Sequence, residues 1–247
     1  MLRLLLLFLL LLIGAMKLWA RPSAPASKAP EKRNGYPIDR VAAPADAYPP
    51  DIVESLVAAA GRPAEPLYVL RWFLDPKTAN DPVKIESARF VHEKGIAFTG
   101  LKKDDAFRIQ DTFVTQLRQR GLLLFATNAA SDPDNFSGPM MYDLALIHGN
   151  DPMEIIRFIQ TNAPNQNLDT ETIVARLETW NKANPFDIVA AETDAVIGKF
   201  HAKPLDLDAF AKDVYLLNPD AIDQGSGTVD AYAEEMEKSG TFTLWWD

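Results

Sequence analysis

The densest group of side chains that could perform chemistry lies between Asp220 and Asp230. Two glycines allow the backbone to turn there, so several oxygen atoms could converge on a cation or a proton-transfer partner. An EF-hand is excluded, because Ile222 stands where a ligand oxygen is required. A loop between two helices, with carboxylates that cap them, is the preferred explanation; a ligand or partner surface is the functional alternative. The candidates are Asp220, Asp223, Gln224, Gly225, Gly227, Thr228 and Asp230.

A second group of candidates combines aromatic and amide side chains. Consecutive residues of a strand point to opposite faces, so one of the two final tryptophans should pack in the core. The other then needs a cover, which could be a helix, a ligand or a partner protein. Asx turns account for the amide residues that precede a capped helix near position 169. These candidates are Trp245, Trp246, Asp247, Thr161, Asn162 and Asn165.

Signatures of established chemistry are missing elsewhere. His92, His148 and His201 lie far apart and lack metal-ligand spacing, so we expect no metal site. Ser226 lies between two glycines but does not form the G-x-S-x-G nucleophile elbow, and no phosphate-binding loop is present, so we expect no cofactor. The loop with Asp132, Asp134 and Asn135 has oxygen ligands that could bind calcium, but a solvated loop explains these residues better.

Composition restricts the partners. The chain has 247 residues, 47% hydrophobic and 24% charged, with a net charge of −9 and no cysteine. Without Arg3 and Lys17, the 23 remaining basic residues face 34 acidic ones, so residues 21–247 carry a net charge of −11. Such a domain repels phosphate backbones, so we expect no nucleic-acid partner. Without disulfides, a packed core must stabilise it.

The N-terminus predicts export. Residues 4–16 are uninterruptedly apolar and follow Arg3, which is typical of a secretory signal with possible cleavage after Ala20. An uncleaved anchor over residues 2–19 is the alternative, and charges on both sides leave the choice open. We therefore expect a periplasmic or otherwise extracytoplasmic protein, soluble or tethered to the inner membrane. Residues 1–20 are the signal or anchor.

The remaining chain divides into a tether and one domain. Residues 21–49 are rich in alanine and proline and predict an extended linker. Residues 50–247 predict a single globular α+β domain, with helices packed on a mixed, mostly antiparallel sheet. Helices are expected at 51–60, 105–120, after Asp169, after Asp206 and after Thr228; strands at 67–74, 96–101, 122–127, 142–148, 153–160, 186–191, 196–201 and 241–246, of which 142–148 with 153–160 and 186–191 with 196–201 form hairpins.

Four segments carry a resemblance to a known family: residues 157–165, the helix 170–177 leading to Trp180, residues 218–229, and residues 244–247. In this order they resemble the bacterial family called domain of unknown function 4253. The resemblance extends over about residues 95–247 and includes Thr161, Asn162 and Asn165. Family members often have a cysteine where this chain has Asn218. The resemblance implies a domain identity and no established activity.

The function is therefore unknown from sequence, with two hypotheses. The first is a non-catalytic binding module at the cell envelope, which recognises another protein or an envelope component. The alternative is a hydrolase that uses Asp220, Asp223 or Asp230 for acid–base chemistry on envelope substrates. A concave pocket with two carboxylates, or a carboxylate and a histidine, would favour the enzyme. We also expect the last strand to place one tryptophan beside residues 220–228.

Overall fold

A computed structural model describes residues 32–33, 36–39, 47–74, 85–130 and 140–246, all within one compact unit of residues 31–247. The predicted signal or anchor, most of the predicted tether, the loop residues Asp132, Asp134 and Asn135, and Asp247 lie outside these residues. Within the described ranges, no helix combines the length and apolar character that crossing a membrane requires.

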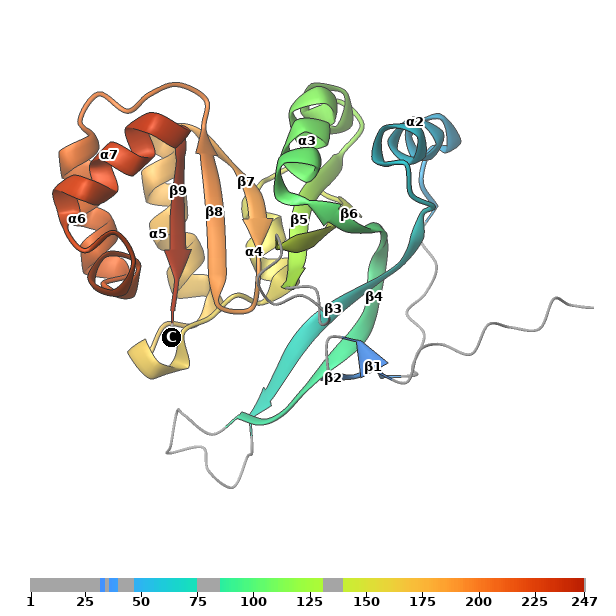
Figure 1. Ribbon diagram of the computed structural model, residues 1–247, viewed down its shortest axis with the longest axis horizontal. Helices are drawn as coiled ribbons and strands as arrows, with labels where there is room; N and C mark the ends of the chain where they lie inside the picture. Colours follow the sequence, from blue (N-terminus) through green and yellow to red (C-terminus); the bar gives the residue numbers. More distant parts are fainter. Residues whose placement is uncertain (1–31, 34–35, 40–46, 75–84, 131–139, 247) are drawn as a thin grey trace, which may run out of the picture. The chain divides into compact units, whose positions relative to one another are not determined.

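Helices and strands are interspersed along the chain, with the long antiparallel strands β3 and β4 near the start and three helices near the end (Figure 1). The elements are β1 (Lys32–Arg33), β2 (Tyr36–Pro37), α2 (Pro50–Ala60), β3 (Glu65–Leu74), β4 (Ile85–Lys102), α3 (Lys103–Arg118), β5 (Leu122–Ala130), β6 (Met141–His148), α4 (Met153–Ile159), the 3-10 helix η2 (Pro164–Gln166), α5 (Thr170–Ala183), β7 (Phe186–Ala191), β8 (Ala195–Phe200), α6 (Leu207–Leu217), the π-helix η3 (Ala221–Ser226), α7 (Val229–Ser239) and β9 (Thr241–Trp245).

One seven-stranded sheet organises the domain, in the order β3-β4-β6-β5-β7-β8-β9. Every neighbouring pair is antiparallel except β5 and β7, which run parallel. The predicted α+β class with a mixed, mostly antiparallel sheet is confirmed. The parallel pair has a single registered pair of residues, Ala126 opposite Ala190, so its ends depend on other contacts.

Alternation along the central strands buries both faces of the sheet. Leu122 and Leu144 point to a core that α2 and α3 cover. Leu123 and Phe125 point to the larger core, which α4, α5, α6 and α7 cover. Successive side chains of a strand leave on opposite faces, so the nearly continuous apolar runs of β5 and β6 fit a sheet covered on both sides.

An aromatic cluster fills the larger core beneath β8 and β9. The Phe242 ring packs 4.8 Å from Phe186 and 5.4 Å from Phe200, between ring centroids. Gly198 lies opposite Phe242 in the β8–β9 ladder, and a Cβ atom there would come within 2.2 Å of the ring. Glycine is therefore needed at this position because the phenylalanine ring occupies the side-chain space.

The predicted strand at residues 153–160 is wrong: these residues form helix α4. Met153, Ile156 and Ile159 are all buried, which is the three-residue spacing of one helical face. Asp151 starts the helix, since its Oδ1 accepts a hydrogen bond from Met153 N at 2.9 Å. At the other end the buried Arg71 donates to the carbonyls of Phe158, at 2.6 Å, and Ile159.

Part of the predicted tether contacts the domain. Ile38 bridges to Phe90 of β4, and the Asp39 N–H donates to the Phe90 carbonyl at 2.7 Å. Tyr36 adds an edge-on ring contact to Phe90 at 6.5 Å. These described residues of the tether are extended, as expected, but they run against the sheet.

Candidate functional site

The turn between β7 and β8, residues 192–194, joins segments that are distant in sequence. The Thr161 hydroxyl donates to the Glu192 carbonyl at 2.7 Å, and the Asn162 N–H donates to the Thr193 carbonyl at 2.9 Å. From the C-terminus, Trp246 N donates to the Asp194 carbonyl at 2.9 Å. We call residues 161–167, 192–194, 220–228 and 245–246 together the motif edge.

A second link ties the polar segment into the motif edge. The Gln166 amide, in η2, donates to Asp220 Oδ2 at 2.7 Å, and the Gln224 amide donates to Asp220 Oδ1 at 3.3 Å. Both carboxylate oxygens of Asp220 are thus used inside the protein. Asp220 holds two segments together, which is a structural task.

Residues 221–226 form a π-helix, where the sequence predicted a loop. Ala221 and Ile222 are buried, so the turn is anchored by the Ile222 side chain that excluded an EF-hand. Gly227 then has a left-handed backbone, with φ of 83°. The predicted cap is confirmed, since Thr228 Oγ1 accepts from Ala231 N at 3.1 Å. Isolated π-helical turns occur frequently at functional sites.

The two tryptophans diverge as expected. Trp246 is buried, with 4% of its surface exposed, while Trp245 is half-buried and lies beside the π-helix. A Cβ atom on Gly225 would be 3.8 Å from Trp245 Nε1. The expected proximity of one tryptophan to residues 220–228 is therefore confirmed.

Asn218 fixes the position of Trp245. It is fully buried, and its side chain makes two hydrogen bonds to the Trp245 backbone: Nδ2 donates to the carbonyl at 2.7 Å, and Oδ1 accepts from the N–H at 2.9 Å. A cysteine, common at this position in the resembling family, could not reproduce both bonds because its thiol is a weak donor and acceptor. The Asn218 side-chain amide thus pairs with the Trp245 backbone as a neighbouring strand would.

Burial separates the predicted site residues into accessible and inaccessible ones. Thr161 is fully buried, so it joins segments and cannot contact a partner. Asn162, Asp220 and Trp245 are partly exposed. The exposed candidates are Asn165, Asp223, Gln224, Gly225, Gly227, Thr228 and Asp230.

Sequence reasoning missed the most perturbed carboxyl group of the motif edge, Glu192. Burial raises the pKa of this carboxyl to about 8, and the negative charges of Asp194 and Asp143 also raise the pKa. The N–H of Ala129, which donates to Glu192 Oε1 at 2.8 Å, opposes the shift, as does the N–H of Asn128. Glu192 is therefore largely protonated at neutral pH. The sequence predicted only the hairpin between 186–191 and 196–201 at this position.

Asn128 brings β5 into this cluster. Its backbone is left-handed, with φ of 52°, and the β5–β6 register shifts at this point. The side-chain amide donates to Asp143 Oδ2 at 2.7 Å and to the Tyr68 carbonyl at 2.6 Å. Asparagine adopts this conformation more readily than most residues. The bulge turns the amides of residues 128 and 129 toward Glu192.

No group of three or more acidic or histidine side chains in the described ranges has the geometry to hold a metal ion. The three histidines occupy three separate places: His92 stacks on Tyr68, with centroids 5.2 Å apart, and His148 stacks on Tyr48, at 4.8 Å. His201 pairs with Asp187 at 3.0 Å, and burial together with the Arg118 charge lowers its pKa.

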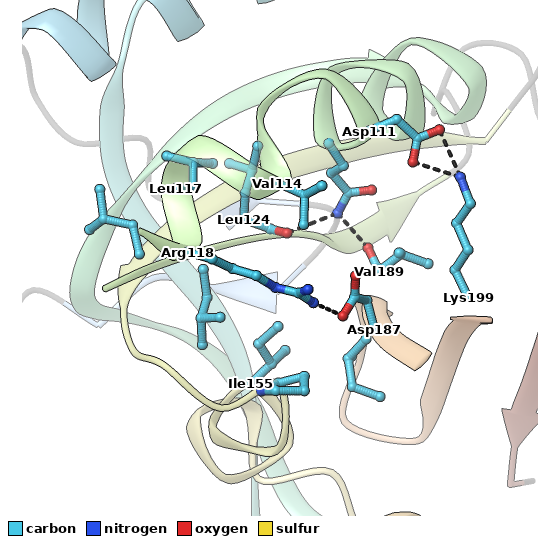
Figure 2. A pocket seen from close by; sticks show the side chains of 14 residues that line it. Asp111, Val114, Leu117, Arg118, Leu124, Ile155, Asp187, Val189 and Lys199 are labelled. Carbon is cyan, nitrogen blue, oxygen red and sulfur yellow. Dashed lines mark hydrogen bonds and ion pairs between the residues drawn. The ribbon is translucent and has the colours of Figure 1, made fainter. Parts of the chain in front are cut away.

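A small cleft of about 50 Å³ opens beneath α3, where β5 and β7 begin (Figure 2). Its walls are apolar, including Leu117, Leu124 and Ile155. Arg118 pairs with Asp187, and Lys199 pairs with Asp111 at 2.6 Å. Both carboxylates of the cleft are therefore ion-paired. The cleft meets the stated criterion of two carboxylates, which is an observation in favour of the enzyme alternative.

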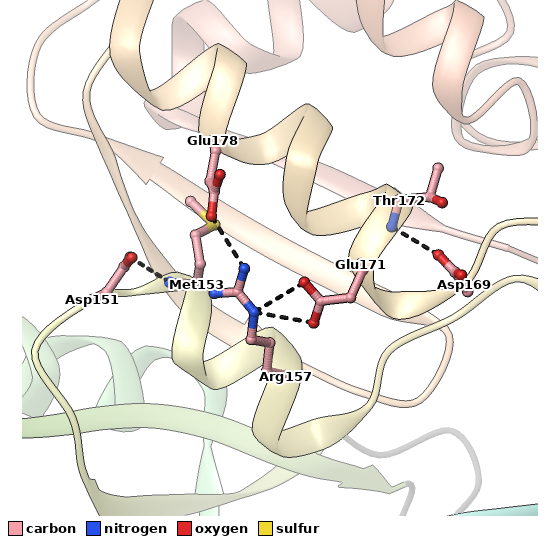
Figure 3. Close-up of polar contacts among 7 residues, drawn as sticks. All are labelled: Asp151, Met153, Arg157, Asp169, Glu171, Thr172 and Glu178. Atoms are coloured by element: carbon pink, nitrogen blue, oxygen red, sulfur yellow. Dashed lines mark hydrogen bonds and ion pairs between the residues drawn. The ribbon is translucent and has the colours of Figure 1, made fainter.

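Salt bridges also position the segment that enters the motif edge. Arg157 of α4 lies between Glu171 and Glu178 of α5, at 3.1 and 3.2 Å (Figure 3). The N-terminal cap of α5 is the predicted one, because Asp169 Oδ1 accepts from Thr172 N at 2.8 Å. The connection between these two helices, which carries Thr161 and Asn162, is held at both ends.

Comparison with known proteins identifies the C-terminal part of the chain. Residues 143–247 match the family model described as Domain of unknown function (DUF4253), which confirms the resemblance but begins at Asp143 and not near Gly95. No curated protein and no solved structure matches the chain. The matched region excludes β5, which lies between β6 and β7 in the sheet, so the folded domain extends beyond the match.

Proposed function

Residues 143–247 match the DUF4253 family model, and three of the four segments that carry the resemblance meet at the motif edge; we propose that this protein is a non-catalytic binding module. In this proposal the exposed part of the motif edge recognises another protein or an envelope component. The N-terminal apolar segment exports the chain and, if uncleaved, tethers it to the inner membrane through residues 2–19.

The observation that carries the proposal is the pairing of an aromatic with exposed polar groups on the π-helix. Asp223 and Gln224 are exposed on the π-helix, and the next residue, Gly225, lies beside the half-buried Trp245. Tyr215 adds a second aromatic, since its hydroxyl donates to Asp223 Oδ2 at 3.3 Å. Aromatic side chains with a fixed backbone contribute strongly to binding, and adjacent carboxylates favour a cationic group on the partner.

The folding task and the binding task fall on different residues of this edge. Asn218, Thr161 and Asp220 use their side chains within the protein. Among the described residues, the side chains of Asp223 and Gln224 make long contacts of 3.3 Å at an exposed surface. Exposed residues with weak internal contacts can be replaced at little cost in stability, which makes the proposal testable.

The hydrolase alternative rests on a different residue from the ones that the sequence suggested. Asp220 is engaged by two amides, and Asp230 forms no ion pair among the described residues. Glu192, with a pKa of about 8, is the carboxyl suited to donating a proton near neutral pH. Loss of a measured hydrolytic activity in the Glu192→Gln variant would favour this alternative.

The proposal predicts that the double substitution Asp223→Ala, Gln224→Ala abolishes partner capture without unfolding the domain. Tagged full-length chain would be crosslinked in intact cells, fractionated, and its partners identified by mass spectrometry. We expect recovery from the envelope fraction, at least about tenfold lower capture by the variant, and a melting temperature within about 2 °C of wild type.

Asp104→Ala, Gln116→Ala is the matched control, because both residues are exposed on α3. It should capture as well as wild type. Equal capture by the motif-edge variant and wild type would reject the motif edge as the binding surface. A large fall in melting temperature would instead assign Asp223 and Gln224 to folding.

A further inference from the structure

The turn at residues 192–194 holds two segments of the motif edge through its backbone carbonyls. Its three carbonyls accept hydrogen bonds from the Thr161 hydroxyl at 2.7 Å, the Asn162 N–H at 2.9 Å and the Trp246 N–H at 2.9 Å. The first two donors lie in the connection between α4 and α5, and the third directly follows β9. A movement of the turn away from the sheet would break all three bonds. The order of the motif edge therefore depends on the position of this turn.

The carboxyl group that anchors the turn has no counter-charge. Glu192 is half-buried as a residue, but its carboxyl reaches the end of β5, where Oε1 accepts from the Ala129 N–H at 2.8 Å. Among the described residues, Glu192 forms no ion pair. An ionised carboxyl in such a place loses its water and gains no cation, so its neutral form is favoured.

Acidic neighbours strengthen this preference. Burial first, and then the charges of Asp194 in the turn and Asp143 on β6, raise the pKa of Glu192 to about 8. Tyr142, also on β6, is a further titratable group beside this carboxyl, since burial and the Glu192 charge raise the pKa of its phenol. These neighbours are neutral or negative up to pH 8, so their charges do not stabilise an ionised Glu192.

The other described elements around the turn supply hydrogen bonds and no cation. β5 contributes backbone N–H groups, and the three residues that donate to the turn carbonyls have uncharged side chains. On β3, Arg71 is engaged by Glu93 at 2.8 Å and by two carbonyls at the end of α4. An ionised Glu192 is therefore best accommodated by moving its carboxyl into water, and its place in a half-buried turn makes that movement short.

We infer that the turn at residues 192–194 is a pH-sensitive switch, in which ionisation of Glu192 favours release of the turn and release frees the segments held at Thr161, Asn162 and Trp246. In the closed turn the carboxyl has a pKa of about 8, whereas its ordinary value is 4.5. The open form therefore loses its proton first as the pH rises. The open fraction grows by up to about tenfold per pH unit between these two values and stops growing above pH 8.

The consequence for binding rests on the proposed function of the motif edge. If the motif edge is the binding surface, the ordered surface becomes less populated as the pH rises from 5 to 8. A partner that needs this ordered surface is then captured more weakly at pH 8 than at pH 6. The switch itself can be measured without any partner.

Hydrogen–deuterium exchange of the full chain at pH 5, 6, 7 and 8, read at single residues by mass spectrometry, tests the switch. Each rate is divided by the rate of an unstructured peptide of the same sequence at the same pH, which gives the open fraction. At the N–H groups of Asn162 and Trp246 we expect this fraction to rise by up to about tenfold per pH unit. In Glu192→Gln, which cannot ionise, the fraction should be the same at all four pH values.

Two controls accompany the measurement. Glu234→Gln is the matched variant, because Glu234 is exposed and pairs with Lys238; it should keep the wild-type dependence on pH. The N–H of Leu146, a fully buried residue of β6 between β4 and β5, reports unfolding of the whole domain. Its open fraction should stay below that of the motif edge at every pH, since a local opening requires less free energy than global unfolding.

Three results would overturn the inference. The first is an open fraction at Asn162 and Trp246 in wild type that does not change with pH, which decides the question even if Glu192→Gln does not fold. The second is a pH dependence that persists in Glu192→Gln. The third is an equal open fraction at Leu146, because the turn would then open only when the whole domain unfolds. A failure to capture any partner would reject the proposed function and leave the switch in place.

Discussion

The backbone groups at the two ends of the parallel pair β5–β7 find hydrogen-bond partners of different chemical types. Only Ala126 and Ala190 are in register, so backbone groups at both ends need partners from elsewhere. A neutral amide supplies them at the end where the strands begin, and a carboxyl group at the end where they finish. The comparison separates a part of the fold that is insensitive to pH from one that is sensitive.

Gln110 closes the beginning of the pair. Its Nε2 donates to the Leu124 carbonyl of β5 at 3.1 Å and to the Val189 carbonyl of β7 at 2.7 Å. The residue is 4% exposed and comes from α3, so a helix side chain takes the place of a ladder hydrogen bond between two strands. The amide has no charge to lose or gain.

Glu192 closes the other end. Its carboxyl accepts from Ala129 N and lies close enough to Asp143 and Asp194 for their charges to affect its pKa. Its carbonyl also accepts from Thr161, so this residue connects the strand pair to the motif edge. Burial of a carboxyl beside other carboxylates favours its neutral form.

The largest expected effect is a dependence of stability on pH that originates at Glu192. The carboxyl has a pKa of about 8 when folded and 4.5 as its ordinary value. The folded state therefore binds more protons between these values, and the free energy of unfolding falls as the pH rises through this window. The slope is at most about 1.4 kcal/mol per pH unit, or up to about 4 kcal/mol between pH 5 and 8.

Urea unfolding at pH 5, 6, 7 and 8 measures this slope. Glu192→Gln, which keeps the shape and removes the ionisation, should reduce it strongly. Glu234→Gln is the control, because Glu234 is exposed and pairs only with Lys238 in the described structure. If Glu192→Gln and wild type lose stability in parallel, another group is responsible.

Gln110→Ala should have the next largest effect. The substitution leaves the carbonyls of Leu124 and Val189 without their donor, and each buried carbonyl that loses its partner costs about 1–3 kcal/mol. We expect a loss of about 2–3 kcal/mol in the free energy of unfolding that is the same at pH 5 and pH 8. Chemical denaturation measures it.

Gln116→Ala serves as its control, because Gln116 is exposed on the same helix; it should change stability by less than about 0.5 kcal/mol. A loss below about 0.5 kcal/mol in Gln110→Ala as well would show that water replaces the amide. The strand pair would then need no side chain to close its beginning.

Local features of this fold could be predicted from sequence. Asp169, Asp206 and Thr228 cap the helices that follow them, since each side chain accepts a backbone hydrogen bond in the first turn. The β7–β8 hairpin was also recognisable, as was the separation of Trp245 from Trp246. In each case the structure depends on residues a few positions apart in the chain, so a local sequence pattern is enough to predict it.

Other features depend on contacts that no local pattern contains. The run Met153–Gln160 is apolar at positions that suit either a strand or a helix, and Arg71, 87 residues before Phe158, contributes the bond that favours the helix. Gln110 and Val189 are 79 residues apart, and Ala129 and Glu192 are 63 apart. The polar groups that close the strand pair therefore look like surface residues in the sequence.

The smallest expected effect concerns the charges at the mouth of the cleft, and it sharpens the comparison. Lys199 and Asp111 form an ion pair at 2.6 Å, but their side chains are 39% and 54% exposed. Water and salt screen such a pair, so Lys199→Met should change the free energy of unfolding by less than about 0.5 kcal/mol, and by less still in 1 M NaCl. Denaturation at 0.05 and 1 M NaCl measures both values. A loss above about 1 kcal/mol would mean that this ion pair, and not Gln110 alone, closes the beginning of the strand pair. Both ends of β5–β7 would then depend on a charged group, and the contrast between a neutral end and a titratable end would fail.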